Sequence, residues 1–356
     1  MRLISRLALA VLLLTSASPA GVRFYKGTYN EALRAAANEK KLVLVDFMTD
    51  WCMWCDTLDA RTYSDSTVAA YVHRHFIPFK IDAEKGDGIP LAKKHGVRAF
   101  PTILVVSAEG DEVDRIIGYA PPDKFLQSLD DICAGKNTIG AVKALLQERP
   151  TDPEAHYAAA QKYIARFDFP NAEEQFRKVL ELDPENTRGH ADDARFETAM
   201  LSLQTSGKPD QLIAFAEAHP SAKEYSQALR LLTRYYLRQK DPGNAQTWFR
   251  RFLEKEPSDA QEMNNFAWEC AGLKANLGYA AEIAAKAVSL ATGDEERAMF
   301  LDTQATVEFE RGNPGAAVVL EQKALGLLGG ASDEVRKPYE ETLAKFKAGN
   351  AAPSAR

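Results

Sequence analysis

The sequence predicts two folds in succession: an α/β sandwich with a mixed sheet flanked by helices, and then an all-α array of repeats. Short, β-branched apolar runs alternate with helix-like segments as far as Cys133, and the last two runs form a hairpin. No convincing strand follows Gly135, and a pattern of about 34 residues recurs in the second half of the chain. Alternating strands and helices are typical of a helix-covered sheet, and a fixed period of this length is typical of stacked helix pairs.

Length and composition suit a globular protein of several domains. The chain has 356 residues, of which 46% are hydrophobic and 26% are charged. Its formal net charge is -6, and no cluster of Lys and Arg interleaved with aromatic residues is found in the sequence. Because nucleic-acid binding depends on neutralising phosphates, we do not expect nucleic acid as a partner.

The first 20 residues differ from this average composition. Arg2 and Arg6 flank the start of an apolar run over residues 7–14, and small residues follow it as far as Ala20. This pattern predicts a secretory signal peptide, residues 1–20, with cleavage after Ala20. The alternative is a membrane anchor, but the run is well short of the ~20 residues that span a bilayer. We therefore expect a periplasmic or secreted protein.

The first domain is predicted over residues 21–135. Thr28 begins a helix that runs to Lys40, with Glu31 in the capping-box position. A continuous apolar run at 42–47 indicates a strand buried on both faces, and the first two cysteines follow it at a strand-to-helix turn. The remaining predicted elements are a helix from the cysteines to about residue 62, helices at 64–72, 89–95 and 122–133, and strands at 76–81, 103–106 and 115–117.

Two of the four cysteines have the spacing of a reactive pair. Cys52 and Cys55, on the first turn of a helix, lie on one side of the turn and can form a disulfide with little movement. The helix N-terminus stabilises the thiolate of the first, so we predict Cys52 as the nucleophile and Cys55 as the resolving thiol. Cys133 and Cys270 are expected to pack as small apolar side chains. A disulfide between these two would require the domains to dock.

A structural zinc half-site is the alternative for the reactive pair. The sequence lacks a second Cys-x-x-Cys, so two of His73, His75 and His95 would have to converge on the metal. We therefore expect neither a metal nor a cofactor.

Residues 42 to about 132 resemble the thioredoxin superfamily. Asp46 falls on the position of a buried carboxylate ahead of Trp51-Cys52-Met53-Trp54-Cys55, and Phe100-Pro101-Thr102 looks like a cis-proline loop. Residues 62–68 and 76–78 are closer to exported thioredoxin-like domains, such as the carboxy-terminal domain of the DsbD electron shuttle. Met53-Trp54 departs from the Gly-Pro of thioredoxin itself, so the strongly reducing potential of thioredoxin is not carried over.

The resemblance implies a role for several positions. Asp46 would accept the proton of Cys55, because a carboxyl buried against apolar strands takes up a proton near neutrality. Pro101, in cis, would stand opposite the sulfurs and leave the preceding backbone free for a substrate peptide. The implied catalytic residues are Cys52, Cys55, Asp46 and Pro101, and the implied substrate contacts are Trp51, Phe100 and Thr102.

The second domain, residues 136–348, is predicted to be a tetratricopeptide-repeat solenoid, followed by a disordered tail at 349–356. The clearest repeat covers 153–186, with small residues at Ala159, Ala160 and Ala172 and with Phe176 in the second helix. A second unit ends at residue 257, two less regular units follow at 264–288 and 301–325, and residues 188–220 are helical but match poorly. Each unit buries its apolar face on its neighbour, so we predict that this region folds alone.

Together these features predict an exported thiol–disulfide oxidoreductase, a reductase in preference to an oxidase or isomerase. The repeats would recruit its protein clients, which are exported proteins with disulfides or dithiols, and the resemblance adds a membrane electron shuttle of the DsbD type as a partner. The repeats could instead only stabilise or space the molecule. The rival function is a repeat-based adaptor whose Cys-x-x-Cys is a redox sensor. Asp46 and Pro101 favour the enzyme, since a sensor needs only the thiols.

Overall fold

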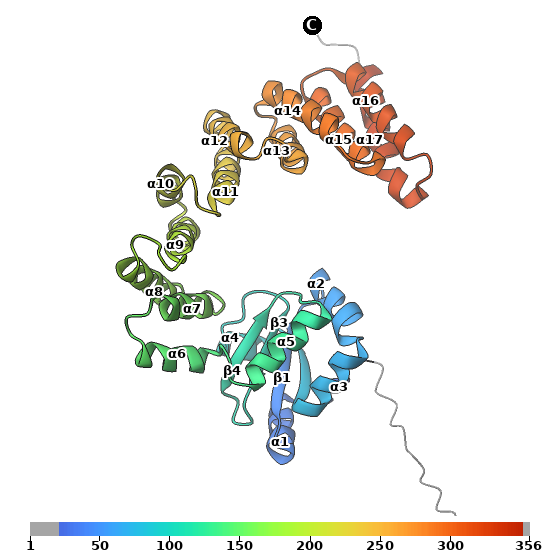
Figure 1. Ribbon diagram of the computed structural model, residues 1–356. Coiled ribbons are helices and arrows are strands. Elements are labelled where there is room, and N and C mark those ends of the chain that lie inside the picture. Colours follow the sequence, from blue (N-terminus) through green and yellow to red (C-terminus); the bar gives the residue numbers. More distant parts are fainter. Residues whose placement is uncertain (1–20, 352–356) are drawn as a thin grey trace, which may run out of the picture. The chain divides into compact units, whose positions relative to one another are not determined.

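The computed structural model describes residues 21–351 of the chain. It forms two compact units, which divide between Ala194 and Arg195 (Figure 1). The predicted signal peptide and residues 352–356 lie outside the described residues. Within residues 21–351, no helix combines the length and apolar character that crossing a bilayer requires.

A four-stranded mixed sheet forms the centre of the first unit. Its strands are β1 (Leu42–Met48), β2 (Phe76–Asp82), β3 (Thr102–Val106) and β4 (Glu112–Ile117), in the order β2-β1-β3-β4. β1 and β2 are parallel, whereas β3 is antiparallel to both β1 and β4. The predicted mixed sheet with a final hairpin is confirmed.

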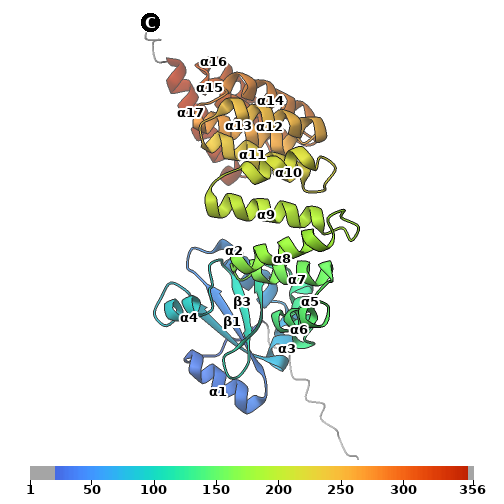
Figure 2. The ribbon, with the colours of Figure 1, turned by 90° about the vertical axis from the view of Figure 1, so that its left-hand side faces the viewer.

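Helices cover both faces of this sheet (Figures 1 and 2). Successive residues of a strand point to opposite faces, so Val43 and Val45 pack in one core with α1 (Tyr29–Glu39) and α4 (Gly88–Lys94). Leu44 lies in the other core, which includes residues of α3 (Ser66–His75) and α5 (Pro122–Cys133). The capping box predicted between Thr28 and Glu31 is present at the start of α1.

One helix differs from the prediction in its type, and one strand differs in where it begins. The helix after the cysteines is α2 (Met53–Thr57), which continues as the π-helical segment η1 (Leu58–Tyr63). β4 begins at Glu112, three residues before the predicted strand at 115. The first half of β4 is charged because Glu112 and Asp114 face cationic side chains of the following helical region, and this polarity hid the strand in the sequence.

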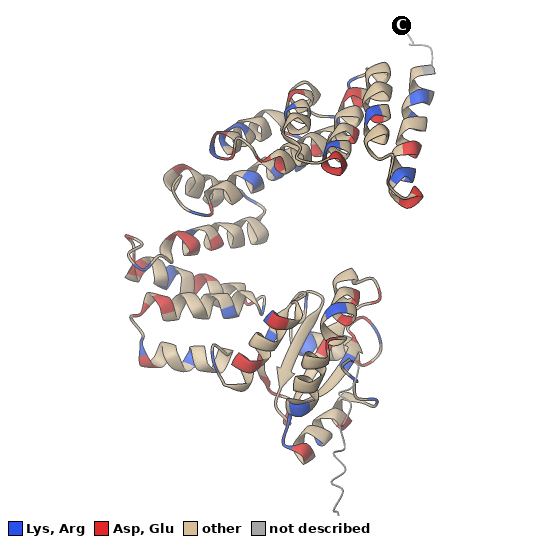
Figure 3. Cartoon of the chain, turned by 45° about the vertical axis from the view of Figure 1, so that its right-hand side comes forward, with Lys and Arg blue, Asp and Glu red and all other residues tan. Residues whose placement is uncertain are grey.

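Paired helices make up the rest of the chain, as predicted. They are α6 (Ile139–Glu148), α7 (Pro153–Ile164), α8 (Phe169–Leu182), α9 (Ala191–Ser206), α10 (Asp210–Ala218), α11 (Tyr225–Arg238), α12 (Pro242–Lys255), α13 (Ala260–Leu273), α14 (Leu277–Leu290), α15 (Asp294–Glu310), α16 (Pro314–Leu327) and α17 (Asp333–Ala351). Ala159, Ala160, Ala172 and Phe176 of the clearest repeat are fully buried, because small residues let α7 and α8 approach each other. Basic and acidic residues are interspersed along the helices (Figure 3).

α17 corrects the predicted end of the ordered chain. This helix continues to Ala351, past the predicted start of the tail at residue 349. Phe346 is fully buried against Ala305 and Ala317, and this contact holds the last turns of α17 on the repeat before it. The small residues from Ala348 onward suggested a tail, but those as far as Ala351 extend the anchored helix.

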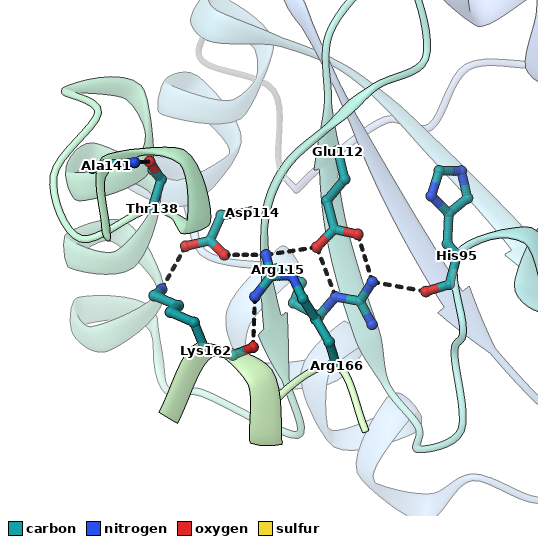
Figure 4. A network of polar contacts seen from close by, with 8 residues as sticks. All are labelled: His95, Glu112, Asp114, Arg115, Thr138, Ala141, Lys162 and Arg166. Carbon is teal, nitrogen blue, oxygen red and sulfur yellow. Dashed lines mark hydrogen bonds and ion pairs between the residues drawn. The ribbon is translucent and has the colours of Figure 1, made fainter. Parts of the chain in front are cut away.

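A network of ion pairs joins the edge strand β4 to α7 within the first unit (Figure 4). Lys162 of α7 contacts Asp114, and Arg166, just beyond α7, contacts both Asp114 and Glu112. Arg115 contributes a further ion pair to Glu112 and donates a hydrogen bond to the carbonyl of His95 at 2.7 Å. The first repeat is therefore in direct polar contact with the sheet.

Candidate active site

Cys52 and Cys55 form a disulfide at the start of α2, as their spacing predicted. Cys52 is the N-cap residue of the helix, and the backbone N–H of Cys55 donates to its sulfur at 3.1 Å. Only 5% of Cys52 and 3% of Cys55 is exposed. The first sulfur therefore receives an N–H of the helix start, which is the contact that stabilises a thiolate at this position.

Asp46 lies in β1, the strand that leads into the cysteine turn, and it is fully buried. Burial raises the pKa of its carboxyl to about 6, although the nearby Lys80 ammonium acts in the opposite direction. The Lys80 Nζ atom is 3.2 Å from Asp46 Oδ2. A carboxyl with this pKa exchanges protons near neutrality.

Lys80 is a site residue that the sequence did not reveal. It stands opposite Asp46 in the parallel register of β1 and β2, and it also contacts Asp59 of η1 at 2.5 Å. Its ammonium lies over the rings of Phe24 and Tyr63, 5.0 and 5.5 Å from their centroids. In the sequence Lys80 only follows an apolar run, and the strand register shows that it reaches Asp46.

The peptide bond between Phe100 and Pro101 is cis, as the resemblance implied. The Pro101 carbonyl accepts a hydrogen bond from the N–H of Gly118 at 2.8 Å, which ties this loop to the residues that follow β4. Thr102 is buried, and its hydroxyl donates to the carbonyl of Ala99 at 2.8 Å. The side chain of Thr102 therefore points away from the surface on which a substrate contact was predicted.

Two aromatic pairs border the disulfide. Trp51 meets the edge of Phe100 at a centroid distance of 6.0 Å, and its indole N–H donates to Glu84 at 3.0 Å. Trp54 stacks on Tyr119, with centroids 5.7 Å apart and planes inclined by 23°. The structure thus brings together two of the predicted substrate contacts, Trp51 and Phe100, and adds a second pair. Residues 118–120 resemble the end of the thioredoxin-like domain, but no role at the site was predicted for Tyr119, because only the fold shows that it stacks on Trp54.

The other two cysteines are free thiols. Cys270 is fully buried, as expected, and burial raises its pKa to about 12. Cys133 is exposed, which corrects the prediction that it packs as an apolar side chain. As the last residue of α5, it lies past the buried Leu129 and Ile132 and contacts Tyr71. Partial burial raises the pKa of Cys133 too, so neither thiol is activated as a nucleophile.

The zinc alternative needs further ligands beside the reactive pair. Within the described residues, no group of three or more His, Cys, Asp or Glu side chains is placed to hold a metal ion. His73 accepts a hydrogen bond from the backbone N–H of Arg23 at 2.9 Å, and both sulfurs of the reactive pair are engaged in their disulfide.

Comparison with known proteins gives the families of both regions. Residues 29–132 match the thioredoxin-like domain family, and residues 153–186 match the tetratricopeptide repeat. The chain therefore carries a thioredoxin-like domain followed by tetratricopeptide repeats. The thioredoxin-like domain resembles the carboxy-terminal domain of DsbD.

Individual relatives cover the thioredoxin-like domain. The thiol:disulfide interchange protein DsbD of Ralstonia nicotianae is 29% identical over 102 residues, which are 28% of this chain and 17% of that relative. A putative disulphide-isomerase from Bacteroides thetaiotaomicron is 38% identical and covers 33% of this chain and 97% of its own, with a TM-score of 0.31. The oxidised carboxy-terminal domain of Neisseria meningitidis DsbD is 25% identical over 28% of this chain and 89% of its own, with a TM-score of 0.25.

Proposed function

We propose that this chain is an exported thiol–disulfide oxidoreductase that reduces disulfides in exported proteins through Cys52 and Cys55. One observation carries the proposal: the two cysteines are paired at a helix start, directly after a strand with a fully buried carboxyl whose pKa is about 6. A redox sensor needs the two thiols but not the proton acceptor. Asp46 therefore favours turnover over sensing.

The reaction begins when the protein is in its dithiol form. The Cys52 thiolate attacks one sulfur of a client disulfide, so that a mixed disulfide forms and the second client sulfur leaves as a thiolate, which takes up a proton. Cys55 then passes its proton to Asp46 and attacks the Cys52 sulfur. This step forms the Cys52–Cys55 disulfide and releases the first client sulfur as a thiol. Two electrons have moved from the protein to the client. The client sulfur that leaves first takes its proton from solvent, which balances the proton that Cys52 lost on ionisation, and the Cys55 proton passes through Asp46 to the client sulfur that leaves last.

A dithiol donor must reduce the Cys52–Cys55 disulfide before the next cycle. The resemblance to the carboxy-terminal domain of DsbD supports a membrane electron shuttle of that type as the donor. The reduction potential of the pair tests this direction of electron flow. A value near ~-270 mV agrees with a reductase, whereas a value near ~-120 mV would make the protein an oxidant.

Export and client recruitment belong to the same proposal. The charged, apolar and small-residue segments of residues 1–20 support a cleaved signal and a periplasmic or secreted location. The repeats support binding of protein clients, because stacked helix pairs present an extended concave surface.

Reduction of insulin disulfides by the full mature chain, with a chemical dithiol as the electron source, tests the function. We expect turnover above background with the wild type, loss of turnover in Cys52→Ser, and wild-type turnover in Cys133→Ser, which removes an exposed thiol outside the reactive pair. Turnover at background with both reactive cysteines intact would overturn the enzyme and leave the adaptor with a redox-sensing pair.

A further inference from the structure

Trp51, Met53 and Trp54 are the three most exposed large apolar side chains between residues 21 and 351, at 68%, 71% and 55%. All three are close neighbours of Cys52 in the sequence. Clustered apolar surface of this kind marks an interaction site, because a soluble protein otherwise tends to cover it. A client cysteine has to reach the sulfur of Cys52, so this surface is continuous with the proposed reaction site.

The stack of Trp54 on Tyr119 is fixed from outside the cysteine turn. Tyr119 directly follows Gly118, whose N–H is hydrogen-bonded to the carbonyl of Pro101. The indole therefore rests on a ring carried by a loop that the neighbouring strands hold in place. A surface that is ordered before binding loses less conformational entropy when a client side chain packs against it.

The two aromatic pairs offer different surfaces to a client. On the Trp51 side, Phe100 meets the indole edge-on at 84°, and the carboxylate of Glu84 accepts the indole N–H. On the Trp54 side, two rings lie close to parallel, and more than half of the Trp54 surface is open. Near-parallel rings extend an apolar face, which favours a further aromatic side chain over a small or charged one.

We propose that Trp54 and Tyr119 are specificity-determining residues, which favour protein clients with an aromatic side chain next to the reactive cysteine. This inference rests on the disulfide exchange proposed for Cys52. The occupant of the surface is an extended client segment, because sulfur-to-sulfur attack places the client cysteine at Cys52 and brings its sequence neighbours within reach of the stack. An aromatic contact of this kind changes a rate by about two- to tenfold.

Competition between two peptides tests the proposal on the full mature chain. Both peptides carry one cysteine as a mixed disulfide with glutathione, and they differ only in having Phe or Ala on either side of it. The reduced protein converts each peptide disulfide into a peptide thiol and glutathione and itself becomes the Cys52–Cys55 disulfide. Chromatography of the peptide thiols after less than one turnover gives the ratio of the two rates, which does not depend on the fraction of active protein.

We expect the wild type to prefer the Phe peptide about fivefold, and the preference to fall to about one in Trp54→Ala and in Tyr119→Ala. Trp268→Ala, which removes an exposed tryptophan of α13, keeps the wild-type ratio. A wild-type ratio of one, or an unchanged ratio in both site variants, overturns the inference while reduction of both peptides upholds the proposed function. Failure of the wild type to reduce either peptide overturns both.

A dimer in sedimentation velocity that Trp54→Ala dissociates would assign the surface to a second copy of the chain and overturn the inference.

Discussion

An ion pair of 2.7 Å joins Arg166, just beyond α7 of the first repeat, to Asp114 of β4, the edge strand of the sheet. Their side chains are only 14% and 2% exposed, and Lys162 occupies the second oxygen of Asp114 at 2.6 Å. A buried carboxylate that loses its cations is strongly destabilising. The first repeat therefore contributes to the stability of the sheet, although the two regions belong to different families.

The domain boundary predicted at Gly135 separates Asp114 from both of these cations. We expect residues 21–135 to be less stable than residues 21–194, because the shorter fragment loses the ion pairs of Asp114 and Glu112 with the first repeat. Denaturant unfolding of the two fragments, followed by a probe of the sheet domain, measures the difference. In the full chain, Arg166→Met should speed hydrogen exchange of the β4 amides, and Arg177→Met, at an exposed ion pair on α8, should not. Equal stabilities of the two fragments would contradict this account of the network.

Asp46→Asn should slow release of the client without preventing the first attack. The loss of a general base lowers the resolution rate on the order of 100-fold. In the wild type this rate should fall as the pH drops below about 6, where Asp46 is protonated, and the variant should lose that step. Both effects are measured by the single-turnover decay of the mixed disulfide between about pH 5 and about pH 8. This range spans the Asp46 pKa of about 6. A variant that keeps the wild-type pH profile would remove Asp46 from the mechanism.

The same substitution should stabilise the fold at neutral pH. The folded-state pKa of Asp46 lies above its unfolded value, so the folded protein holds this proton more tightly. Stability is therefore lost as the pH rises from about 4 to about 6, and Asp46→Asn should escape this loss. Denaturant midpoints at both ends of that range show the effect as a flatter pH dependence in the variant.

Lys80→Met should raise the pH below which the resolution rate falls. The ammonium at 3.2 Å opposes the burial effect, so its removal raises the pKa of Asp46 above about 6. At neutral pH a larger fraction of Asp46 is then protonated and unable to accept the proton of Cys55. Lys41→Met, at an ion pair on the surface of the same domain, is the matched control. A downward shift in Lys80→Met would contradict the assignment.

A carboxyl pair predicts a pH dependence in the last repeat. Glu321 of α16 is fully buried, and burial together with the neighbouring Asp302 carboxyl of α15 raises its pKa to about 8. Tyr339 of α17 faces the same two groups. Because the folded-state pKa is raised, stability of this repeat should fall as the pH rises from about 4.5 to about 8.

Hydrogen exchange of the α15 and α16 amides should show this decline in the wild type and not in Glu321→Gln. Glu340→Gln, at an exposed ion pair, should behave as the wild type, and an equal decline in all three would be evidence against the pair.

Local sequence patterns were enough to predict the fold and half of the site. The Cys-x-x-Cys spacing after a buried strand gave the disulfide, and the spacing of small and aromatic residues gave the paired helices. Lys80, Tyr119 and Glu84 could not be found in this way, because each meets the site through strand register or a loop distant in the sequence. Thr102 shows the converse, since a local motif placed it beside the site but the fold turns its side chain inward.

The division of labour between the two sulfurs tests the central claim most directly. Cys55→Ser leaves the nucleophile at the helix start and removes the thiol that releases the client, so this variant should accumulate a mixed disulfide with its clients. Cys52→Ser should accumulate none, because the remaining thiol lies within the helix and is not at the N-cap, where a backbone N–H stabilises the thiolate. Non-reducing electrophoresis of the two variants, with mass spectrometry of the adducts, identifies both the bond and the client. Equal adducts in Cys52→Ser, or adducts through Cys133 or Cys270, would contradict Cys52 as the nucleophile.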